Sequence, residues 1–460
     1  MLTHQLAPVT RPVIWLLVLC LVPALAGCDA GSSTEQAPSS AVNQSSTPPA
    51  ENPDSGAAAG AEPDVAPEPA VEAPQPVSAA KPAPPMPVDY INPITAEDAA
   101  TGWISLFDGA SLFGWRLHEG GANWRVEDQA IVVDDGPKDL LCTSVPFKDY
   151  ELRLEFRQPA GGNSGVFLRT SEQPQNPAED CYELNIADEH PEGFTTGSFV
   201  GRQKTAEPVA ASTDWRKLHV VAEGQRFTVT LDGVQVLDYT DEGEHQQPTG
   251  LIGLQKNEGR IEFKNIRLRP LTMTDLFNGQ DLTGWRVVPD LKSEFSVVDG
   301  EIHVVNGLGF LESEGAWADF VFQAEAKTNA PELNSGYFFR ALPIEPGGNC
   351  NGYEAQISNA LINGDRRNPK DHGTGAIFRR TKARYVVPND GEWFTTTLVA
   401  AGPQFAVWVD GYQVVDWTDT RPAAENPREG QRLGLGHIAL QGHDPTTDLN
   451  FRNLRIADLQ

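Results

Sequence analysis

The heptapeptide NSGVFLR at Asn163–Arg169 has the pattern of a β-strand, and it recurs as NSGYFFR at Asn334–Arg340. Side chains at alternate positions of a strand share a face. The second, fourth and sixth residues of each heptapeptide therefore face one way, and the third, fifth and seventh face the other. We expect the first set to be buried in a core and the arginine to lie on the opposite face, beside a glycine and an aromatic ring.

Other stretches repeat in the same order. LFDGASLFGWR at Leu106–Arg116 matches LFNGQDLTGWR at Leu276–Arg286, 170 residues later, and FKNIRL at Phe263–Leu268 matches FRNLRI at Phe451–Ile456, 188 residues later. Ordered matches with a growing offset indicate a duplicated domain whose second copy has longer loops. We place the first copy at residues 101–271 and the second copy at residues 272–460.

Each copy is rich in short segments of alternating polar and apolar residues. Examples are ELRLEF at Glu151–Phe156, RFTVTLDG at Arg226–Gly233 and FAVWVDG at Phe405–Gly411, with turns of Gly, Asn, Asp and Pro between such segments. These are strand and turn signals, and neither copy shows an amphipathic helical pattern of three turns. The sequence predicts an all-β protein in which each copy is a β-sandwich or jelly roll of two stacked sheets.

The first 27 residues have the features of a secretory signal. A single charged residue, Arg11, precedes the apolar run Val13–Leu25, which is shorter than the roughly 20 residues that span a bilayer. The run ends in Leu-Ala-Gly-Cys at Cys28, which resembles the lipobox of bacterial lipoproteins. The resemblance implies lipidation of Cys28 and an exported, membrane-anchored protein of the periplasm or the bacterial cell surface. Asp29 would favour retention at the inner membrane under the enterobacterial rule.

Residues 28–100 contain a segment rich in Pro, Ala and Glu, with stretches such as AEPDVAPEPAVEAPQPV. Such a composition cannot bury enough apolar surface to offset the entropy of ordering the chain. We interpret it as a disordered tether between the membrane and the folded copies. The whole chain carries a net charge of −28, which repels phosphate backbones and argues against nucleic acid as a partner.

Three cysteines, Cys142, Cys181 and Cys350, lie in the two copies. An exported compartment would permit a bridge between Cys142 and Cys181. The odd count does not indicate a disulfide framework, however. We expect three buried or unreactive thiols.

A second strand motif supplies polar groups. In YELNI and YEAQI, the tyrosine and the third and fifth residues face the core, so Glu183, Asn185, Glu354 and Gln356 face the other way. An arginine, a carboxylate, an amide and an aromatic ring together are suited to binding a sugar. Arginine–glutamate pairs that serve only structure are equally compatible with this pattern, and such pairs often contribute little to stability.

The ordered set of motifs is similar to that of the 3-keto-disaccharide hydrolase domain family. It comprises FDGxSLxGW, NSGxFxR, YExQI, the Thr-Gly-Ala-Ile-Phe at Thr374–Phe378, IxLQ and FxNIRL, and it covers both copies from Ser105 to about Ala457. The resemblance implies two tandem concanavalin-like jelly rolls, each with a sugar site on a concave face. It also implies cleavage of 3-keto-glycosides or 3-keto-disaccharides by elimination and hydration, which amounts to net hydrolysis.

This chemistry requires a base and a group that stabilises an enolate oxygen. In the second copy we expect Arg340 and Gln356 to donate to that oxygen and Glu354 or His443 to transfer protons. His443 fits the histidine that often follows the family's LQ motif, although Asp444 replaces the next glycine. The first copy has Asn257 at the position of His443. The expected substrate-binding residues are Phe338 in the second copy and Arg169, Glu183, Asn185 and Asp188 in the first copy.

Copy one lacks the histidine and replaces the glutamine of YExQ with Asn185, so we expect the second copy to be the active one. The alternative function is a non-catalytic carbohydrate-binding lipoprotein in which the first copy is the more degraded, and a structural scaffold is a third option. An upstream sugar 3-dehydrogenase would supply the ketone. We expect no cofactor.

Two other kinds of site are disfavoured by the sequence. Laminarinase-type glycosidases need a second carboxylate two residues after the glutamate, but Asn185 and Gln356 occupy those positions. One possible metal site would join His437 and His443, which lie about 20 Å apart if the strand between them is continuous. Asp371 and His372 could join His443 only through folding that the sequence does not show. We therefore expect no metal.

Overall fold

The computed structural model describes residues 85–86, 90, 92–119 and 121–460. Within these ranges the chain is almost entirely β, with one short helix, α1 (Ala96–Ala100). The prediction of an all-β fold is confirmed. The proposed signal sequence, Cys28 and most of the tether lie outside the described residues. No helix in the described part of the chain is long and apolar enough to span a membrane.

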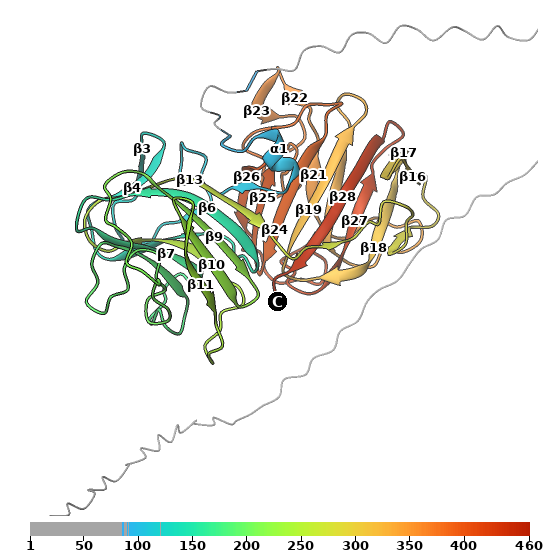
Figure 1. Ribbon diagram of the computed structural model, residues 1–460. Coiled ribbons are helices and arrows are strands. Elements are labelled where there is room, and N and C mark those ends of the chain that lie inside the picture. Colours follow the sequence, from blue (N-terminus) through green and yellow to red (C-terminus); the bar gives the residue numbers. More distant parts are fainter. Residues whose placement is uncertain (1–84, 87–89, 91, 120) are drawn as a thin grey trace, which may run out of the picture. The chain divides into compact units, whose positions relative to one another are not determined.

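Two antiparallel sheets form the sandwich of the first copy (green strands in Figure 1). The larger sheet has the order β11-β10-β9-β6-β13-β4-β3, with β1 also pairing with β13. Its strands are β1 (Ile104–Ser105), β3 (Arg125–Glu127), β4 (Ala130–Val133), β6 (Tyr150–Arg157), β9 (Arg216–Glu223), β10 (Arg226–Leu231), β11 (Val234–Thr240) and β13 (Ile261–Pro270). The five-stranded sheet, in the order β2-β5-β12-β7-β8, consists of β2 (Trp115–Arg116), β5 (Asp139–Thr143), β12 (Leu251–Lys256), β7 (Asn163–Thr170) and β8 (Tyr182–Ala187).

The second copy repeats this architecture. Its larger sheet has the order β16-β17-β28-β19-β24-β25-β26, with β14 also pairing with β28. The strands are β14 (Thr274–Asp275), β16 (Glu294–Val298), β17 (Glu301–Val305), β28 (Asp448–Asp458), β19 (Phe320–Thr328), β24 (Phe394–Ala401), β25 (Gln404–Val409) and β26 (Tyr412–Thr418). The five-stranded sheet, in the order β15-β18-β27-β20-β21, consists of β15 (Trp285–Val287), β18 (Gly309–Trp317), β27 (Gly436–Gly442), β20 (Ser335–Ala341) and β21 (Tyr353–Ile357). A small hairpin, β22 (Leu361–Ile362) and β23 (Asp365–Pro369), is added in this copy.

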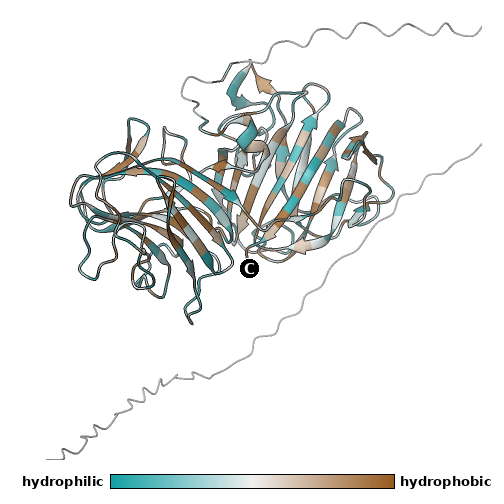
Figure 2. Cartoon of the chain, in the orientation of Figure 1, coloured by the Kyte–Doolittle hydropathy of each residue, from teal (hydrophilic) through white to brown (hydrophobic). Residues whose placement is uncertain are grey.

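The core of each copy lies between its two sheets. Hydrophobic and hydrophilic residues alternate along many strands (Figure 2), as expected when one face is packed and the other is not. In the second copy, Tyr337 and Phe339 of β20 and Tyr353 of β21 belong to this core, as the alternation predicted. We call the opposite side of the five-stranded sheet its outer face, and the polar members of the motifs lie there.

The two motif arginines do not lie on the outer face, so the prediction for Arg340 and Arg169 is wrong. Both residues have left-handed backbone conformations, with φ values of 46° and 48° respectively. The ladder between β20 and β27 shifts register between Phe338 and Ala341. An irregularity of this kind interrupts the alternation of side chains. The arginine that simple alternation assigns to the outer face is therefore turned into the space between the sheets.

Arg340 links the two sheets of the second copy. Its side chain is fully buried, with the guanidinium 5.2 Å from the centre of the Phe405 ring in the opposite sheet. The guanidinium donates to the carbonyl oxygens of Ala318, Gly402 and Arg432 and to the Asp319 carboxylate, at distances between 2.6 and 2.9 Å. None of these acceptors is Glu354 or Gln356. Arg340 is therefore a structural residue that joins loops of the larger sheet to the smaller one.

Arg169 makes the equivalent set of contacts in the first copy. Its guanidinium donates to the carbonyl oxygens of Lys148, Gly224 and Gln247 and to the Asp149 carboxylate. The repeated heptapeptide thus encodes the same buried junction twice. This explains why an arginine closes both copies of the motif without any need for a ligand.

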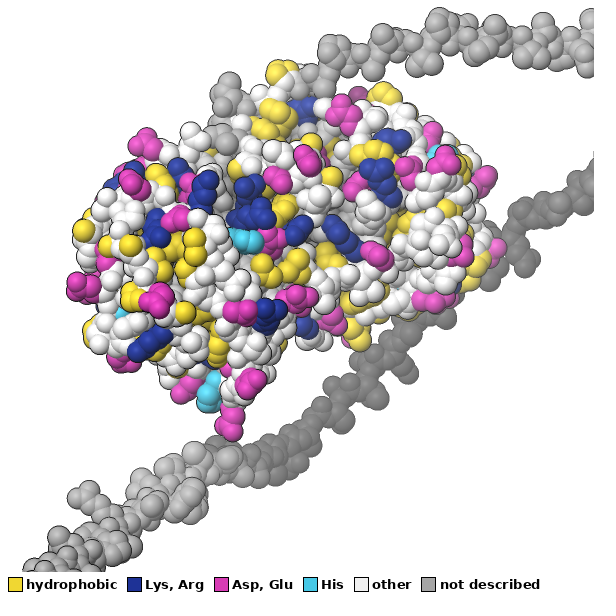
Figure 3. Space-filling model, viewed as in Figure 1, with side chains coloured by type: hydrophobic (Ala, Val, Ile, Leu, Met, Phe, Trp, Pro, Cys, Tyr) yellow, Lys and Arg dark blue, Asp and Glu magenta, His cyan; other side chains and the backbone are white. Residues whose placement is uncertain are grey.

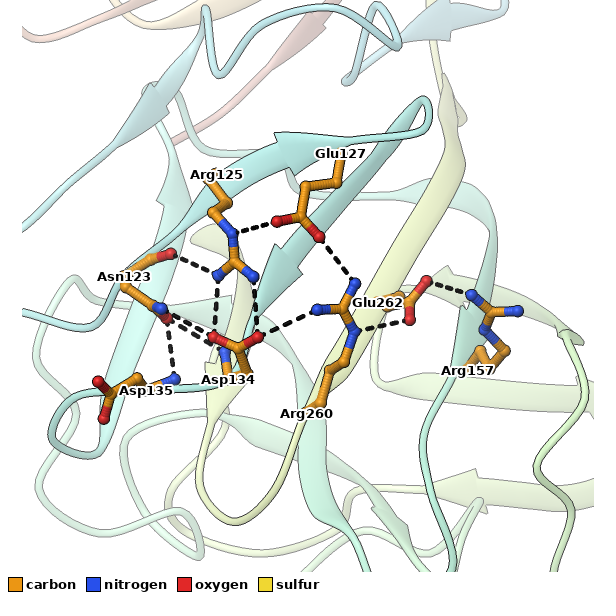
Figure 4. Close-up of polar contacts among 8 residues, drawn as sticks. All are labelled: Asn123, Arg125, Glu127, Asp134, Asp135, Arg157, Arg260 and Glu262. Carbon is orange, nitrogen blue, oxygen red and sulfur yellow. Dashed lines mark hydrogen bonds and ion pairs between the residues drawn. The ribbon is translucent and has the colours of Figure 1, made fainter.

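Surface charges on the larger sheet of the first copy are paired with one another. Figure 4 shows a chain of contacts in which Arg125 binds Asp134, Asp134 binds Arg260, and Arg260 binds Glu262, at distances of 2.8 to 3.0 Å. These side chains are partly exposed, so each pair contributes about 0–1 kcal/mol. On the molecular face in Figure 3, acidic and basic side chains are likewise interspersed.

Cys142, Cys181 and Cys350 are free and buried, as expected from the sequence. Burial raises the pKa of the Cys142 and Cys181 thiols to about 12, and it also raises the pKa of Cys350. These thiols are protonated at neutral pH and therefore poor nucleophiles.

Candidate functional site

The outer face of the five-stranded sheet in the second copy carries two rows of side chains. The pairing of β20 with β21 places Gly336 opposite Gln356 and Phe338 opposite Glu354. On the other side of β20, the pairing of Tyr337 with Leu440 brings Gln441 beside Gly336. One row therefore reads Gln441, Gly336, Gln356, and Glu354 lies in the next row.

Glu354 leans over Gly336. A Cβ atom added to this glycine would lie 2.8 Å from the Cγ atom of Glu354 and 2.9 Å from its Oε1 atom. Contacts this short do not occur at real Cβ atoms, so any other residue would displace the carboxyl group. The glycine of NSGYFFR is thus required for the position of Glu354.

The Glu354 carboxyl group is buried and accepts no hydrogen bond from any residue that the structure describes. Its pKa is raised from 4.5 to about 7, chiefly by burial and also by the nearby Asp371, while the charges of Arg428 and Arg379 act in the opposite direction. A carboxyl group with a pKa near neutrality can both take and give a proton at physiological pH. Glu354 is therefore equipped for acid–base chemistry.

A cavity of about 150 Å³ lies against Glu354, at the edge of the sheet. Three arginines, Arg379, Arg380 and Arg428, line it together with Phe378. Arg428 lies over the ring of Phe338 and donates to the Cys350 carbonyl oxygen, and Arg379 lies over Phe378. The cavity thus combines a titrating carboxyl group with positive charge.

Gln356 is held in a small polar network. Its Nε2 atom donates to Asn334 Oδ1 and to Asp371 Oδ2, both at 3.2 Å, and Asn334 donates to the same Asp371 oxygen at 2.7 Å. The Oε1 atoms of Gln356 and Gln441 are buried and have no hydrogen-bond partner in the described chain. Unpaired buried acceptors are costly, and two of them flank Gly336, where a water molecule or a hydroxyl group could donate to them.

The structure leaves His443 apart from this network. It follows the last residue of β27, and its Nδ1 atom contacts Asp444 Oδ2 at 2.9 Å with the side chain 41% exposed. His437, at the other end of the strand, contacts the carbonyl oxygens of Ser313 and Gly315 instead. Among the described residues, no group of three or more His, Cys, Asp or Glu side chains could hold a metal ion, and the expectation of no metal stays a prediction.

Phe338 is not available as a stacking platform, so this part of the predicted site is wrong. The side chain is fully buried and packs edge-on against Phe310, in a cluster that includes Cys350 and Ala439. The longer loops of the second copy cover the ring, because Arg428 lies over it. Alternation predicted the correct face but could not show that a loop lies over that face.

The first copy has the same arrangement with different partners. Gly165 lies opposite Asn185 and Phe167 opposite Glu183. Gln255, the counterpart of Gln441, donates from Nε2 to Glu183 Oε1 at 3.0 Å. Burial raises the pKa of Glu183, although the hydrogen bond from Gln255 and the charge of Lys138 lower it.

Asn185 and Asp188 contact the chain in the first copy. The Asn185 side-chain amide donates to the Phe194 carbonyl oxygen, and Asp188 Oδ2 accepts from the Gly161 amide at 3.1 Å. Asn185 is thus occupied in the same way as Gln356, whereas Asp188 stabilises a neighbouring loop. Binding roles for Glu183, Asn185 and Asp188 stay predictions.

Sequence reasoning missed several residues of this region. Asn334 and Asp371 hold Gln356, Gln441 completes the row, and Arg379 and Arg428 line the cavity. Asn334 opens the repeated heptapeptide and Gln441 ends the LQ motif, so both could have been singled out. Arg379 directly follows the Thr374–Phe378 motif, whereas Arg428 lies in a loop outside the motifs, and only folding brings both to Glu354.

Fold and site together define a class of β-sandwich proteins that carry a polar, partly enclosed site on the outer face of the smaller sheet. Residues 102–269 and 272–457 each match the model of the 3-keto-alpha-glucoside-1,2-lyase-like domain. The chain belongs to this family and contains two tandem copies of the domain.

Several known proteins are similar to this chain. A 3-keto-disaccharide hydrolase from Bacteroides thetaiotaomicron is 30% identical over 233 residues, which cover 37% of this chain and 79% of the relative. The solved structure of a protein provisionally assigned as a glycosyl hydrolase, from Parabacteroides distasonis, matches with a TM-score of 0.35 at 22% identity, over 39% of this chain and 98% of that one. The carbohydrate-binding module CBM66 from Bacillus subtilis matches with a TM-score of 0.27 at 17% identity, over 34% and 95% of the two chains.

Proposed function

We propose that this protein cleaves 3-keto-glycosides or 3-keto-disaccharides by elimination followed by hydration, and that Glu354 transfers the protons. The observation that carries the proposal is a buried carboxyl group with a pKa of about 7 beside a cavity and two unpaired amide oxygens. Membership in the family and the similarity to a 3-keto-disaccharide hydrolase support the substrate class.

The proposed reaction uses the acidity of the hydrogen on carbon 2, next to the ketone at carbon 3. Ionised Glu354 takes this proton, and the electron pair of the broken bond forms an enolate. Collapse of the enolate breaks the bond from carbon 1 to the aglycone oxygen, which leaves with a proton from Glu354. Water then adds its oxygen to carbon 1 and a proton to carbon 2, so that the net change is hydrolysis.

The charge on the enolate oxygen needs a partner other than Arg340, which is bound to carbonyl oxygens and to Asp319. Arg428 and Arg379 are the cations whose charges reach Glu354. Both arginines are exposed at the rim of the cavity, and positive charges held next to a developing anion stabilise it. We assign them this role in the proposed mechanism.

The direct test is turnover by the full chain with Glu354→Gln. Chemically prepared 3-keto-glucosides are incubated with the protein, and free 3-ketoglucose is measured. Loss of a general base typically costs about 100- to 10,000-fold in rate. Glu345→Gln is a matched control because Glu345 is exposed and lies in a nearby loop.

The pH profile provides a second criterion. If Glu354 acts as the base, kcat/KM of the wild-type protein should fall about tenfold per pH unit below about pH 7, where the carboxyl group becomes protonated. Wild-type turnover that is unaffected by Glu354→Gln would refute the assignment of Glu354. Absence of any wild-type turnover would refute the enzymatic proposal.

The second candidate function is carbohydrate binding without turnover. It is favoured by the burial of Glu354, because a carboxyl group that is only 6% exposed presents little surface for proton transfer with a bound sugar. Saturable binding of 3-keto-glucosides without product would support this function.

We also propose that the protein is exported and anchored to a bacterial membrane by lipid on Cys28. The support is the sequence Leu-Ala-Gly-Cys directly after an apolar run. At the membrane, a sugar 3-dehydrogenase is the class of enzyme that would supply the 3-keto substrate.

A further inference from the structure

A larger cavity lies on the first copy, at the corresponding outer face. Its volume is about 360 Å³, and its lining includes His118, Lys138, Phe167, Glu172, Gln255 and Lys256. Gln255 is the counterpart of Gln441, and Phe167 is the counterpart of Phe338. The copy that the sequence marks as degraded therefore has the more spacious cavity.

His118 is held at this cavity by Asp139. The Nδ1 atom of His118 lies 2.9 Å from Asp139 Oδ1, while Asp139 Oδ2 accepts from the Ala122 amide at 3.0 Å and from Trp124 Nε1 at 2.9 Å. Burial alone would raise the pKa of Asp139, but the hydrogen bonds from His118, Ala122 and Trp124 lower it overall. The ionised carboxylate can only accept hydrogen bonds, so Nδ1 carries a proton and donates it to Asp139.

This fixed tautomer leaves the Nε2 atom of neutral His118 with a free lone pair. Nε2 is buried and has no hydrogen-bond partner in the described chain, and the same holds for Gln255 Oε1 in the lining of the same cavity. An imidazole oriented through Nδ1 by a carboxylate is the arrangement that enzymes use for a general base. Two buried, unpaired acceptors on residues that line one cavity are compatible with a ligand that brings acidic hydrogens or hydroxyl groups.

The second copy has no such pair. Lys256 pairs with Asp139 in the first copy, and its counterpart Gly442 pairs with Gly309 in the second copy, so Gly309 corresponds to Asp139. The repeated motif that ends at Arg116 and Arg286, at an offset of 170 residues, places Val288 at the position of His118. The second copy instead has His443, at the position where the first copy has Asn257.

We propose that the first copy is a second acid–base site, in which His118 Nε2 is the base that removes the carbon 2 proton of a 3-keto sugar. This proposal rests on the substrate class of the proposed function. Nε2 takes the proton, the electron pair of the broken bond becomes the enolate double bond, and the carbonyl electron pair moves onto the oxygen at carbon 3. Return of a solvent-derived proton from the imidazolium exchanges the hydrogen without any oxidant or co-reactant.

The experiment measures deuterium incorporation at carbon 2 of 3-ketoglucose in D₂O by NMR, with the full chain carrying Glu354→Gln. This background removes the proton-transfer group proposed for the second copy. We expect exchange above the buffer rate, and we expect a further His118→Asn substitution to slow it about 100-fold or more. His245→Asn is the matched control because this histidine is exposed.

Two additional variants guard against loss of folding. His118→Val introduces the residue of the second copy, and Asp139→Asn removes the carboxylate that fixes the tautomer. Both should reduce exchange while calorimetry still shows binding of 3-ketoglucose. Exchange that is insensitive to His118, or exchange no faster than in buffer, would overturn the proposal. Cleavage of 3-keto-glucosides by the wild-type protein is measured in a separate assay. Failure of the proposed function would appear there as absence of released 3-ketoglucose, whereas failure of this proposal would appear as absence of His118-dependent deuterium exchange.

Discussion

At the scale of single residues, Arg340 shows how a local backbone conformation decides which face of the sheet a side chain occupies. Three carbonyl oxygens and one carboxylate depend on its guanidinium, and the side chain has no exposed surface. Removing one partner of a buried ionic contact leaves the others unpaired, which is far more costly than losing a surface ion pair.

We therefore expect Arg340→Met to lower the free energy of unfolding by about 3 kcal/mol or more. Arg226→Met is a suitable control, because Arg226 pairs with Asp238 on the surface with 62% of its side chain exposed, and its loss should have little effect on stability. Urea titration of both variants measures the difference. Equal stability of the two variants would contradict the structural role of Arg340.

Glu354 should make stability depend on pH. Its pKa in the folded protein, about 7, exceeds the ordinary value of 4.5, so between these values the folded state holds more protons than the unfolded state. The stability that comes from the protonated form is therefore lost as the pH rises from about 4.5 to 7. The glutamine variant does not titrate at this position.

We expect Glu354→Gln to gain stability relative to the wild type as the pH rises from 5 to 8, by up to about 3 kcal/mol. Chemical denaturation at the two pH values measures this gain. For the control Glu345→Gln, the difference in the free energy of unfolding from the wild type should be the same at pH 5 and at pH 8. If the difference in stability between Glu354→Gln and the wild type does not change with pH, the pKa of the Glu354 carboxyl group is not raised by burial.

At the scale of elements, the irregularity in β20 depends on a glycine in the neighbouring strand. A Cβ atom added to Gly436 would lie 2.2 Å from the carbonyl carbon of Arg340, and one added to Gly250 would lie 2.3 Å from that of Arg169. These glycines allow two backbones to approach closely where the arginines turn inward. The irregularity is thus encoded on two strands at once.

Gly436→Ala should therefore destabilise the second copy by about 1–3 kcal/mol or more, since backbone atoms must move to relieve the clash. Gly434→Ala is a close control, because an added Cβ atom there would meet only the Arg432 side chain, at 3.8 Å or more. Thermal unfolding distinguishes the two variants. Similar midpoints would show that the strands can separate at this point without cost.

At the scale of the whole molecule, the prediction concerns the anchor. Cys28→Ser should move the protein from the membrane fraction to the soluble fraction, because lipid on this residue is the expected attachment. Fractionation of bacterial cells followed by a high-salt wash measures the distribution. Continued sedimentation of the substituted protein with membranes would contradict the lipoprotein proposal.

Much of the fold could be predicted from the sequence, because it depends on local strand patterns that are present in both copies. Alternation in YELNI and YEAQI correctly assigned Tyr182 and Tyr353 to the cores and Glu183 and Glu354 to the outer faces. The duplication follows from motifs that recur in the same order, and the all-β class follows from patterns of residues near one another in the sequence. In the site, the same rules predicted the carboxyl group, the glycine beneath it and the neighbouring Gln356.

Other features were decided only by tertiary structure, since they depend on groups far apart in the sequence. The inward turn of Arg340 requires the close approach of Gly436, and the covering of Phe338 requires Arg428 from a distant loop. The pKa of Glu354 is set by burial, which no single strand determines. The pairing of His118 with Asp139 arises because two strands align them. Sequence periodicity fixes which face a side chain takes on a regular strand, whereas long-range packing decides what lies above that face and where the strand departs from regularity.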